Sequence, residues 1–169
     1  KDALEDKNKL PKNGLSQDDK DKLKKFTRFF SDLLRKFNFQ SCNINYIRIS
    51  EETYFPIIDS SELMNEMLRN DSSASDFTRV MWAYTLGLYM LSKEYKANHP
   101  AFIFFDEPAQ HSISNESSWQ LFDSLSKASC QTIVADSFNN DDQVFIESTK
   151  GIDFKLIKFE GRLLKRRLV

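Results

Sequence analysis

Two adjacent carboxylates, Asp106 and Glu107, directly follow a short run of large apolar residues. Residues 101–105 read Ala-Phe-Ile-Phe-Phe, and prolines flank the stretch at positions 100 and 108. A run this short and this apolar predicts a strand that is buried on both faces of a sheet. Ligands bind at the carboxyl ends of such strands, where Asp106 could hold Mg²⁺ and Glu107 could act as a general base on a water. The alternative is that the acidic pair simply ends a strand in solvent.

A second chemically suggestive stretch, Ser-Ser-Ala-Ser-Asp-Phe-Thr-Arg at residues 72–79, directly precedes an apolar segment. We expect a helix over about residues 80–95, apolar nearly all round and therefore buried, with Gly87 at a close contact. Small residues at a helix start leave backbone N–H groups unobstructed for a phosphate, and Ser73 or Ser75 could add a hydroxyl donor. A serine-rich cap with no ligand is the simpler alternative.

An amphipathic helix is expected near the amino end of the chain. Residues 1–15 are charged, contain a proline, and indicate a linker or the end of a coiled coil. Ser16 then caps a helix that has Asp18 and Asp19 in its first turn. Its apolar residues recur at steps of three and four, and they are Leu23, Phe26, Phe30, Leu33 and Phe37. This helix is either an ordinary domain helix or the last turns of a coiled coil.

Apolar residues on both sides of a polar turn predict a hairpin over residues 44–49 and 53–58. Pro56 assigns the second strand to a sheet edge, because proline cannot donate a backbone hydrogen bond to a neighbouring strand. A short helix is expected to follow over residues 61–68. None of these elements carries chemistry of its own.

The carboxyl half predicts a strand, a helix and a second strand in succession. The helix is expected over about residues 116–128, and a short buried strand over residues 131–135 is followed by Asp136 and Ser137. This order implies a right-handed crossover and a parallel pair of strands, so the two strand ends should meet at one edge of the sheet. Two further strands and a turn are expected beyond them, over residues 144–146, 154–159 and 160–162.

Taken in this order, the motifs resemble the C-terminal lobe of ABC-type ATPase heads, particularly those of the SMC and RecN group of coiled-coil DNA-maintenance ATPases. The signature of that group reads Ser-Gly-Gly-Glu-x-x-Arg, and residues 73–79 match it in register as Ser-Ala-Ser-Asp-Phe-Thr-Arg. Residues 106–108 match the Asp-Glu-Pro that follows the apolar residues of Walker B, which here covers residues 102–107. Residues 131–137 are similar to the strand that leads into the switch loop.

The resemblance spans residues 16–160 and implies a fold and site roles. The fold class is α/β, the C-terminal half of a P-loop ABC-type head, with a mainly parallel sheet, flanking helices and a coiled-coil-derived N-terminal helix. Residues 16–169 would form this lobe. Asp106 would bind Mg²⁺, Glu107 would deprotonate the water that attacks the γ-phosphate, and Ser137 would lie in the switch loop. The signature residues that would contact ATP held by a second head are Ser73, Ala74, Ser75 and Asp76.

The sequence also departs from that family. Ala74 and Ser75 replace two glycines, Ser137 stands where many members have the switch histidine, and the aspartate usual after Walker B is absent. The chain contains no Gly-x-x-x-x-Gly-Lys-Ser/Thr phosphate loop. In SMC-like proteins that loop lies in an N-terminal lobe at the other end of a long coiled coil, so the resemblance implies ATP hydrolysis only when that lobe is present.

Two other classes of function stay open. The first is a scaffold or binding domain whose ATPase motifs have decayed, which the altered signature and the missing histidine favour. The second is a small-molecule enzyme that uses Asp106 and Glu107 with a different metal arrangement. The sequence has only two histidines and no clear nucleophile–base pair to support the second class.

The resemblance further implies partners and a setting. ATP and Mg²⁺ would bind where this lobe meets the N-terminal Walker A lobe of the same protein and a second ATPase head in a dimer. Because the family couples head engagement to DNA binding or processing, double-stranded DNA and accessory subunits are further implied partners. The processes that the resemblance implies are DNA repair, chromosome maintenance or antiviral defence against phage. The implied location is the cytoplasm and, in a bacterium, the nucleoid.

Composition limits the number of domains, the partners and the compartment of the chain less sharply than the motifs do. A chain of 169 residues with 40% apolar residues suits one domain with a core. Residues 1–36 carry 11 basic and 7 acidic side chains, and residues 155–169 carry 6 and 1, so the basic ends flank an acidic middle. That balance is compatible with a nucleic-acid contact, although a solvated helix face is the simpler interpretation. Two distant cysteines indicate a reduced intracellular compartment, and no apolar run approaches the roughly 20 residues that span a membrane.

Overall fold

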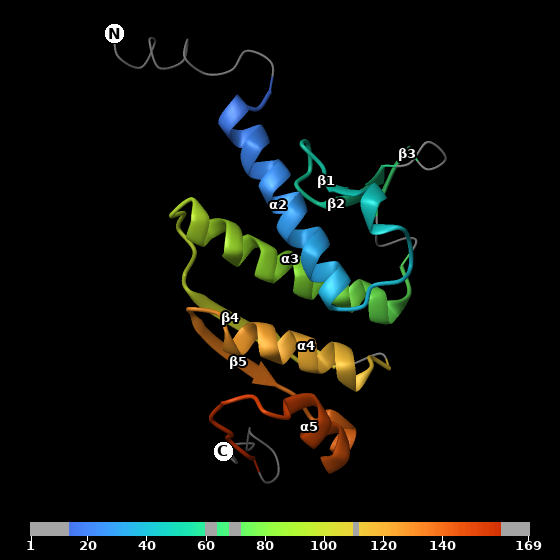
Figure 1. The fold of residues 1–169 in the computed structure, drawn as a ribbon, viewed down its shortest axis with the longest axis vertical. Coiled ribbons are helices and arrows are strands. Elements are labelled where there is room, and N and C mark those ends of the chain that lie inside the picture. The colour runs from blue at the N-terminus through green and yellow to red at the C-terminus, as the bar shows by residue number, and fades with distance from the viewer. Residues whose placement is uncertain (1–13, 60–63, 68–71, 110–111, 160–169) are drawn as a thin grey trace, which may run out of the picture.

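The computed structural model describes residues 14–59, 64–67, 72–109 and 112–159, which form a mixed fold of helices and strands (Figure 1). Helix α2 (Gln17–Lys36) begins after Ser16, whose hydroxyl accepts a hydrogen bond from the Asp19 N–H. The Asp19 carboxylate in turn accepts one from the Ser16 N–H, which completes a capping box. The predicted cap is therefore confirmed.

The apolar stripe of α2 packs against helix α3 (Ala74–Glu94). Phe30 and Leu34 are completely buried, and Phe26 and Phe30 make edge-on ring contacts with Tyr84 of α3. Because this apolar stripe is buried against α3, α2 is a domain helix over its described length. Of the linker or coiled-coil end expected over residues 1–15, residues 1–13 lie outside the described residues.

Three short antiparallel strands follow α2 and a 3-10 turn (Ile44–Tyr46), in the order β1 (Ile47–Ile49), β2 (Pro56–Asp59) and β3 (Met64–Met67). The predicted hairpin is confirmed by the β1–β2 pairing, but its first strand is shorter than expected, because residues 44–46 form the 3-10 turn. The helix expected over residues 61–68 is wrong where the chain is described, because β3 pairs with the second edge of β2. The edge assignment of Pro56 is also wrong. Pro56 is tolerated in this central strand because it is the first residue and β3 pairs only from Ile57 onward.

Helix α3 begins at Ala74 with Ser73 as its N-cap, so it starts six residues before the predicted boundary. Trp82, Ala83 and Leu86 lie in the core at 1%, 0% and 3% exposure. Met81 and Leu88 are instead 49% and 39% exposed. The expectation of a helix buried on all sides is therefore wrong for the described chain, since one apolar face of α3 is open.

Gly87 lies where α3 crosses α2, as the sequence predicted. A Cβ at this position would lie 3.0 Å from Cε2 of Phe26 and 3.7 Å from the backbone nitrogen of Phe30. Phe26 is itself buried and cannot easily move away.

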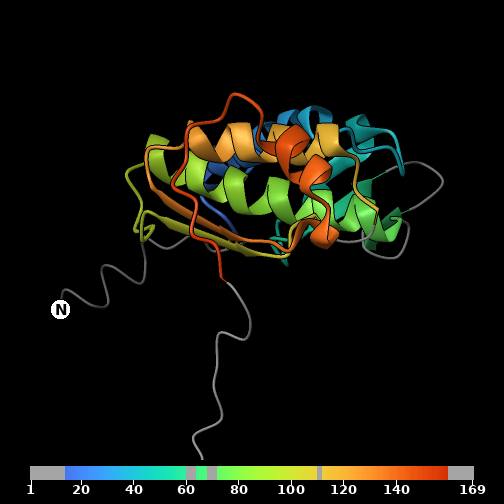
Figure 2. The same cartoon turned by 90° about the horizontal axis from the view of Figure 1, so that it is seen from below.

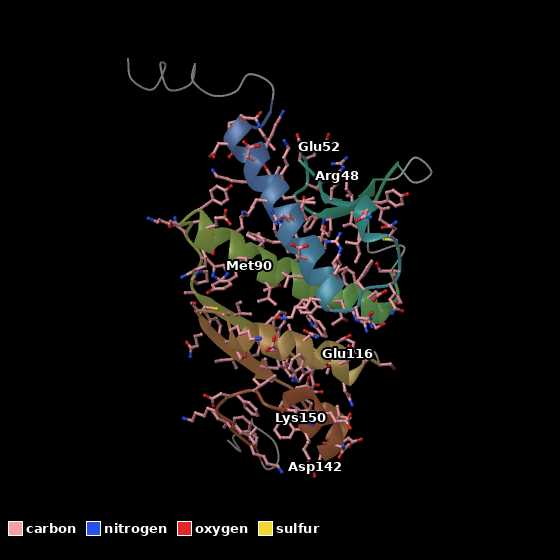
Figure 3. The ribbon with its side chains drawn as sticks, in the orientation of Figure 1. Arg48, Glu52, Met90, Glu116, Asp142 and Lys150 are labelled. Atoms are coloured by element: carbon pink, nitrogen blue, oxygen red, sulfur yellow. The ribbon has the colours of Figure 1, made fainter. Side chains whose placement is uncertain are left out.

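We expect Gly87→Val to lower the free energy of unfolding by about 1–3 kcal/mol, because the added carbons overpack this crossing. Urea unfolding of the chain measures the effect. The control is Met90→Val at an exposed residue of the same helix (Figure 3), which should cost only about 0.5 kcal/mol through helix propensity. Equal losses in the two variants would contradict the close packing at Gly87.

The strands β4 (Phe102–Asp106) and β5 (Gln131–Ala135) pair in parallel, with Phe102 opposite Gln131 and Asp106 opposite Ala135. Helix α4 (Asn115–Ser126), capped by the Ser114 hydroxyl, connects them. The predicted strand, helix and parallel strand are confirmed.

Only one face of the β4–β5 pair is covered by described helices (Figure 2). Ile103 points into the core and is 2% exposed, whereas Phe102, Phe104 and Ile133 on the other face are 41%, 53% and 43% exposed. The prediction that β4 is buried on both faces is therefore wrong for the described chain, and so is the prediction that β5 is a buried strand. Parallel sheets are normally covered on both faces, so this open apolar face is unusual.

The chain after β5 forms a 3-10 turn (Phe138–Asn140) and helix α5 (Asp142–Thr149), so the strand expected over residues 144–146 is wrong. The Asp141 carboxylate accepts hydrogen bonds from the Gln143 and Val144 N–H groups and starts the helix instead. Residues 152–159 form no strand with any described residue, so the strand expected over residues 154–159 is also wrong, and the turn at 160–162 lies outside the described chain. No helix in the described ranges is long and apolar enough to cross a membrane.

Candidate functional site

The carboxyl ends of β4 and β5 bring Glu107 and Ser137 together, as the sequence predicted. The Glu107 N–H donates to the Ala135 carbonyl at 2.7 Å, which extends the strand pairing by one residue. The Ser137 hydroxyl and N–H then donate to Oε2 of Glu107 at 3.1 and 3.3 Å. Glu107 is half-buried, whereas the preceding carboxylate, Asp106, is exposed. The two strand ends therefore form one polar edge.

Glu107 has a left-handed backbone conformation, with φ of 46°. For a residue with a side chain this conformation costs roughly 1–2 kcal/mol. Phe138, just after Ser137, has the same handedness, with φ of 48°. Strain of this kind is retained where the surrounding contacts hold it, and it clusters at binding and catalytic sites. Here it turns the Glu107 side chain toward the β5 end.

Asp136 is a residue of this edge that the sequence analysis placed correctly but did not assign a role. Its carboxylate accepts hydrogen bonds from the Phe138 N–H at 2.6 Å and the Ala109 N–H at 3.2 Å, so it ties together the loops that follow β5 and β4. Partial burial raises the pKa of Asp136, and the nearby charges of Glu107 and Asp106 raise it further. Its position as the first residue after β5 was the sequence feature that could have indicated a role for Asp136 at this edge.

The carboxylates at this edge do not form a metal site on their own within the described part of the chain. Among the described residues, no group of three or more His, Cys, Asp or Glu side chains could hold a metal ion. Mg²⁺ commonly takes only one or two carboxylates from the protein and its other ligands from phosphates and water. The exposed carboxylate of Asp106 can supply one such ligand.

The second predicted stretch forms the N-terminus of α3. The Ser73 hydroxyl accepts from the Asp76 N–H at 3.2 Å and lies 3.2 Å from the Ser75 hydroxyl. The backbone N–H groups of Ala74 and Ser75 have no acceptor within the described part of the chain, as is usual in a first helical turn. Ser73 and Ala74 are exposed, so these donors face outward.

Asp76 points inward and has a different role from its three neighbours. It is 3% exposed, and its carboxylate accepts from the Ser41 hydroxyl at 2.6 Å, from the Ser41 and Gln40 N–H groups at 2.7 and 3.1 Å, and from Arg79 at 2.7 Å. Burial alone would raise the pKa of Asp76, but these donors outweigh it and hold the pKa below its usual value. Asp76 therefore fixes the protein's own structure at this helix end.

Sequence reasoning missed Ser41 and Gln40, the partners of Asp76. They lie 35 and 36 positions before it, and no local pattern connects them. Only the fold brings the end of α2 beside the start of α3.

The two parts of the candidate site face the same end of the molecule. The N-termini of α3 and α4 and the carboxyl ends of β4 and β5 all lie toward one end of the fold in Figures 1 and 2. Glu116 in the first turn of α4 is labelled near this end in Figure 3. The structure thus places the signature-like stretch and the acidic strand end on a common side.

The basic residues of α2 are mostly neutralised. Apart from Lys20, each of its Lys and Arg side chains forms an ion pair with a described carboxylate. Lys25 pairs with Glu94 of α3, and Lys36 pairs with Asp123 of α4. Such paired charges are typical of a solvated helix face and give no support to a nucleic-acid surface on α2.

No protein-family model matches this chain, and no curated protein matches it.

Proposed function

We propose that this chain is the C-terminal lobe of an SMC-like ATPase head, which binds and hydrolyses ATP at the interface of two heads when an N-terminal Walker A lobe completes it. The observation that carries the proposal is the contact between Glu107 and Ser137 at the carboxyl ends of two parallel strands. A general base must be held at such an edge with one oxygen free for water. Ser137 occupies Oε2 of Glu107, and Oε1 has no partner within the described residues.

In the proposed mechanism, Glu107 accepts the proton of the water that attacks the γ-phosphate. Ser137 orients the carboxylate, and Asp136 fixes the two loops that carry Glu107 and Ser137. Asp106 would hold Mg²⁺, which when bound neutralises charge that develops on the phosphates. Ser73 and the free N–H groups of Ala74 and Ser75 would contact the γ-phosphate of ATP bound by the second head.

The open face of the β4–β5 pair supports the proposal that a second lobe completes this domain. Phe102, Phe104 and Ile133 form an apolar surface on a type of sheet that is normally covered on both sides. Both β4 and β5 also have an unpaired outer edge within the described chain. An added lobe with its own strands would cover this surface and supply the phosphate loop.

We expect Phe104→Asp to weaken association with the Walker A lobe at least tenfold, or about 1.4 kcal/mol, because it places a charge in an apolar contact. Analytical ultracentrifugation of mixed lobes measures the dissociation constant. The matched control is Met90→Asp, which places the same charge on an exposed apolar residue of α3. Equal affinities of the two variants would contradict docking on the β4–β5 face.

Titration of Mg·ATP into this chain, into the Walker A lobe and into their mixture tests the proposed function. We expect saturable binding in the mixture that exceeds any binding by either lobe alone. Absence of binding in a folded, associated mixture would contradict it.

The scaffold alternative is favoured by the altered signature, with Ala74 and Ser75 in place of two glycines, and by Ser137 at the position of the switch histidine. It predicts that the lobes associate without hydrolysing ATP. The remaining parts of the proposal, which are double-stranded DNA, accessory subunits, a cytoplasmic or nucleoid location, and a role in repair, chromosome maintenance or antiviral defence, are supported by the motif resemblance alone.

A further inference from the structure

A buried polar cluster joins the N-termini of α3 and α4, and the mechanism above does not use it. Arg79 of α3 and Ser117 of α4 are 8% and 0% exposed. The Nε and one terminal nitrogen of Arg79 both donate to the Ser117 hydroxyl at 3.3 Å, and the other terminal nitrogen donates to Asp76 at 2.7 Å. The Ser117 hydroxyl donates onward to the Phe37 carbonyl at 3.0 Å. The guanidinium therefore joins α3 to Ser117 of α4, and the Ser117 hydroxyl joins both helices to the end of α2.

These contacts are directional, which distinguishes them from the apolar packing around them. A planar guanidinium fixes the angle as well as the distance to its acceptors, whereas apolar side chains tolerate sliding. Loss of these contacts would be strongly destabilising, because it would leave a buried cation without its acceptors. The cluster therefore sets one relative position of the two helix ends.

The cluster extends to one part of the candidate site and to the N-cap of α4. On one side, Asp76 holds the Ser41 hydroxyl, which accepts a hydrogen bond from the Ser73 N–H at 3.1 Å. On the other side, the Ser117 N–H donates to the hydroxyl of Ser114, the N-cap of α4. A continuous set of hydrogen bonds thus runs from the signature-like end of α3 to the N-terminus of α4.

We propose that Arg79 and Ser117 are positioning residues that hold the Ser73 end of α3 in register with Ser114 at the N-terminus of α4. This inference rests on the proposed function, because it assigns the Ser73 end to contact with a second head. It adds that the geometry of that end is set from within the lobe by the Arg79–Ser117 contact.

Hydrogen exchange of this chain tests the positioning directly. In Ser117→Ala and Arg79→Lys, the Ser41, Ser73 and Asp76 amides should exchange about tenfold or more faster, whereas amides in the middle of α2 should be unchanged. The control is Ser124→Ala on the same helix, whose hydroxyl bonds only the local Gln120 carbonyl. Unchanged exchange at the three amides in both variants would overturn the inference, as would equal acceleration over the whole chain.

ATP turnover by the mixed lobes supplies the second readout. In Ser117→Ala, the protein concentration for half-maximal turnover should rise about tenfold, or about 1.4 kcal/mol, with an unchanged KM for ATP, because only engagement of the second head is weakened. A proportional loss of turnover at all protein concentrations would indicate a merely structural role and overturn the inference. If the wild-type mixture hydrolyses no ATP, the proposed function fails, and the exchange measurement still decides whether Arg79 and Ser117 position this end.

Discussion

Glu107→Gln should slow ATP turnover by the mixed lobes by about 10²–10⁴-fold, the usual contribution of a general base. The amide is nearly isosteric and can still accept the Ser137 hydrogen bonds through its oxygen, so the strand edge should keep its geometry. What the variant loses is the ability to take a proton from water. Binding of Mg·ATP should therefore be retained, and heads should accumulate as ATP-bound dimers.

Steady-state phosphate release and the mass of the complex in Mg·ATP measure these two effects. Glu116→Gln is the matched control, because it makes the same change in the first turn of α4, near the same end of the molecule (Figure 3). That control should turn over ATP at a rate close to the wild type. A Glu107→Gln variant that retains wild-type turnover would remove Glu107 from the proposed role.

Asp76→Asn should lower the free energy of unfolding by about 3–5 kcal/mol, the typical loss when one partner of a buried ion pair is removed. The substitution leaves Arg79 at 8% exposure without its opposite charge and replaces a carboxylate that accepts from Ser41 and Gln40. Denaturant unfolding of the chain measures the loss. Asp32→Asn, which affects an ion pair whose carboxylate is 60% exposed, should leave the stability nearly unchanged.

The pH dependence gives an independent check on Asp76. Because its pKa is lower in the folded than in the unfolded chain, its charge contributes stability that is complete above the ordinary value of 3.8 and is lost as the pH falls below it. The difference in unfolding free energy between wild type and Asp76→Asn should therefore be constant near neutral pH and shrink on acidification below about pH 4. A difference that grows on acidification would contradict the assignment.

Local signals allowed several elements to be predicted. The capping box at Ser16 and the regular apolar spacing of α2 lie within a few residues of one another, so they can be read directly. The strand, helix and strand order was sufficient for the parallel pair, because such connections have few alternatives. That pairing in turn predicts that Glu107 and Ser137 lie at the same edge of the sheet.

Other features depended on contacts that sequence patterns do not reveal. Residues 144–146 are apolar and favour a strand, but Asp141 caps a helix there through the Gln143 and Val144 N–H groups. The length and apolarity of β4 suggested burial on both faces, although only one face is covered in the described chain. For the candidate site, Asp76 could be recognised as part of a motif, but its inward orientation depends on Ser41, 35 positions away.

The most direct test of the proposed function is the rate of ATP turnover by this chain alone, by the Walker A lobe alone and by their mixture, each with and without double-stranded DNA. We expect turnover only in the mixture, with stimulation by DNA. A folded and associated mixture that releases no phosphate under any of these conditions would contradict the ATPase proposal and favour the scaffold alternative.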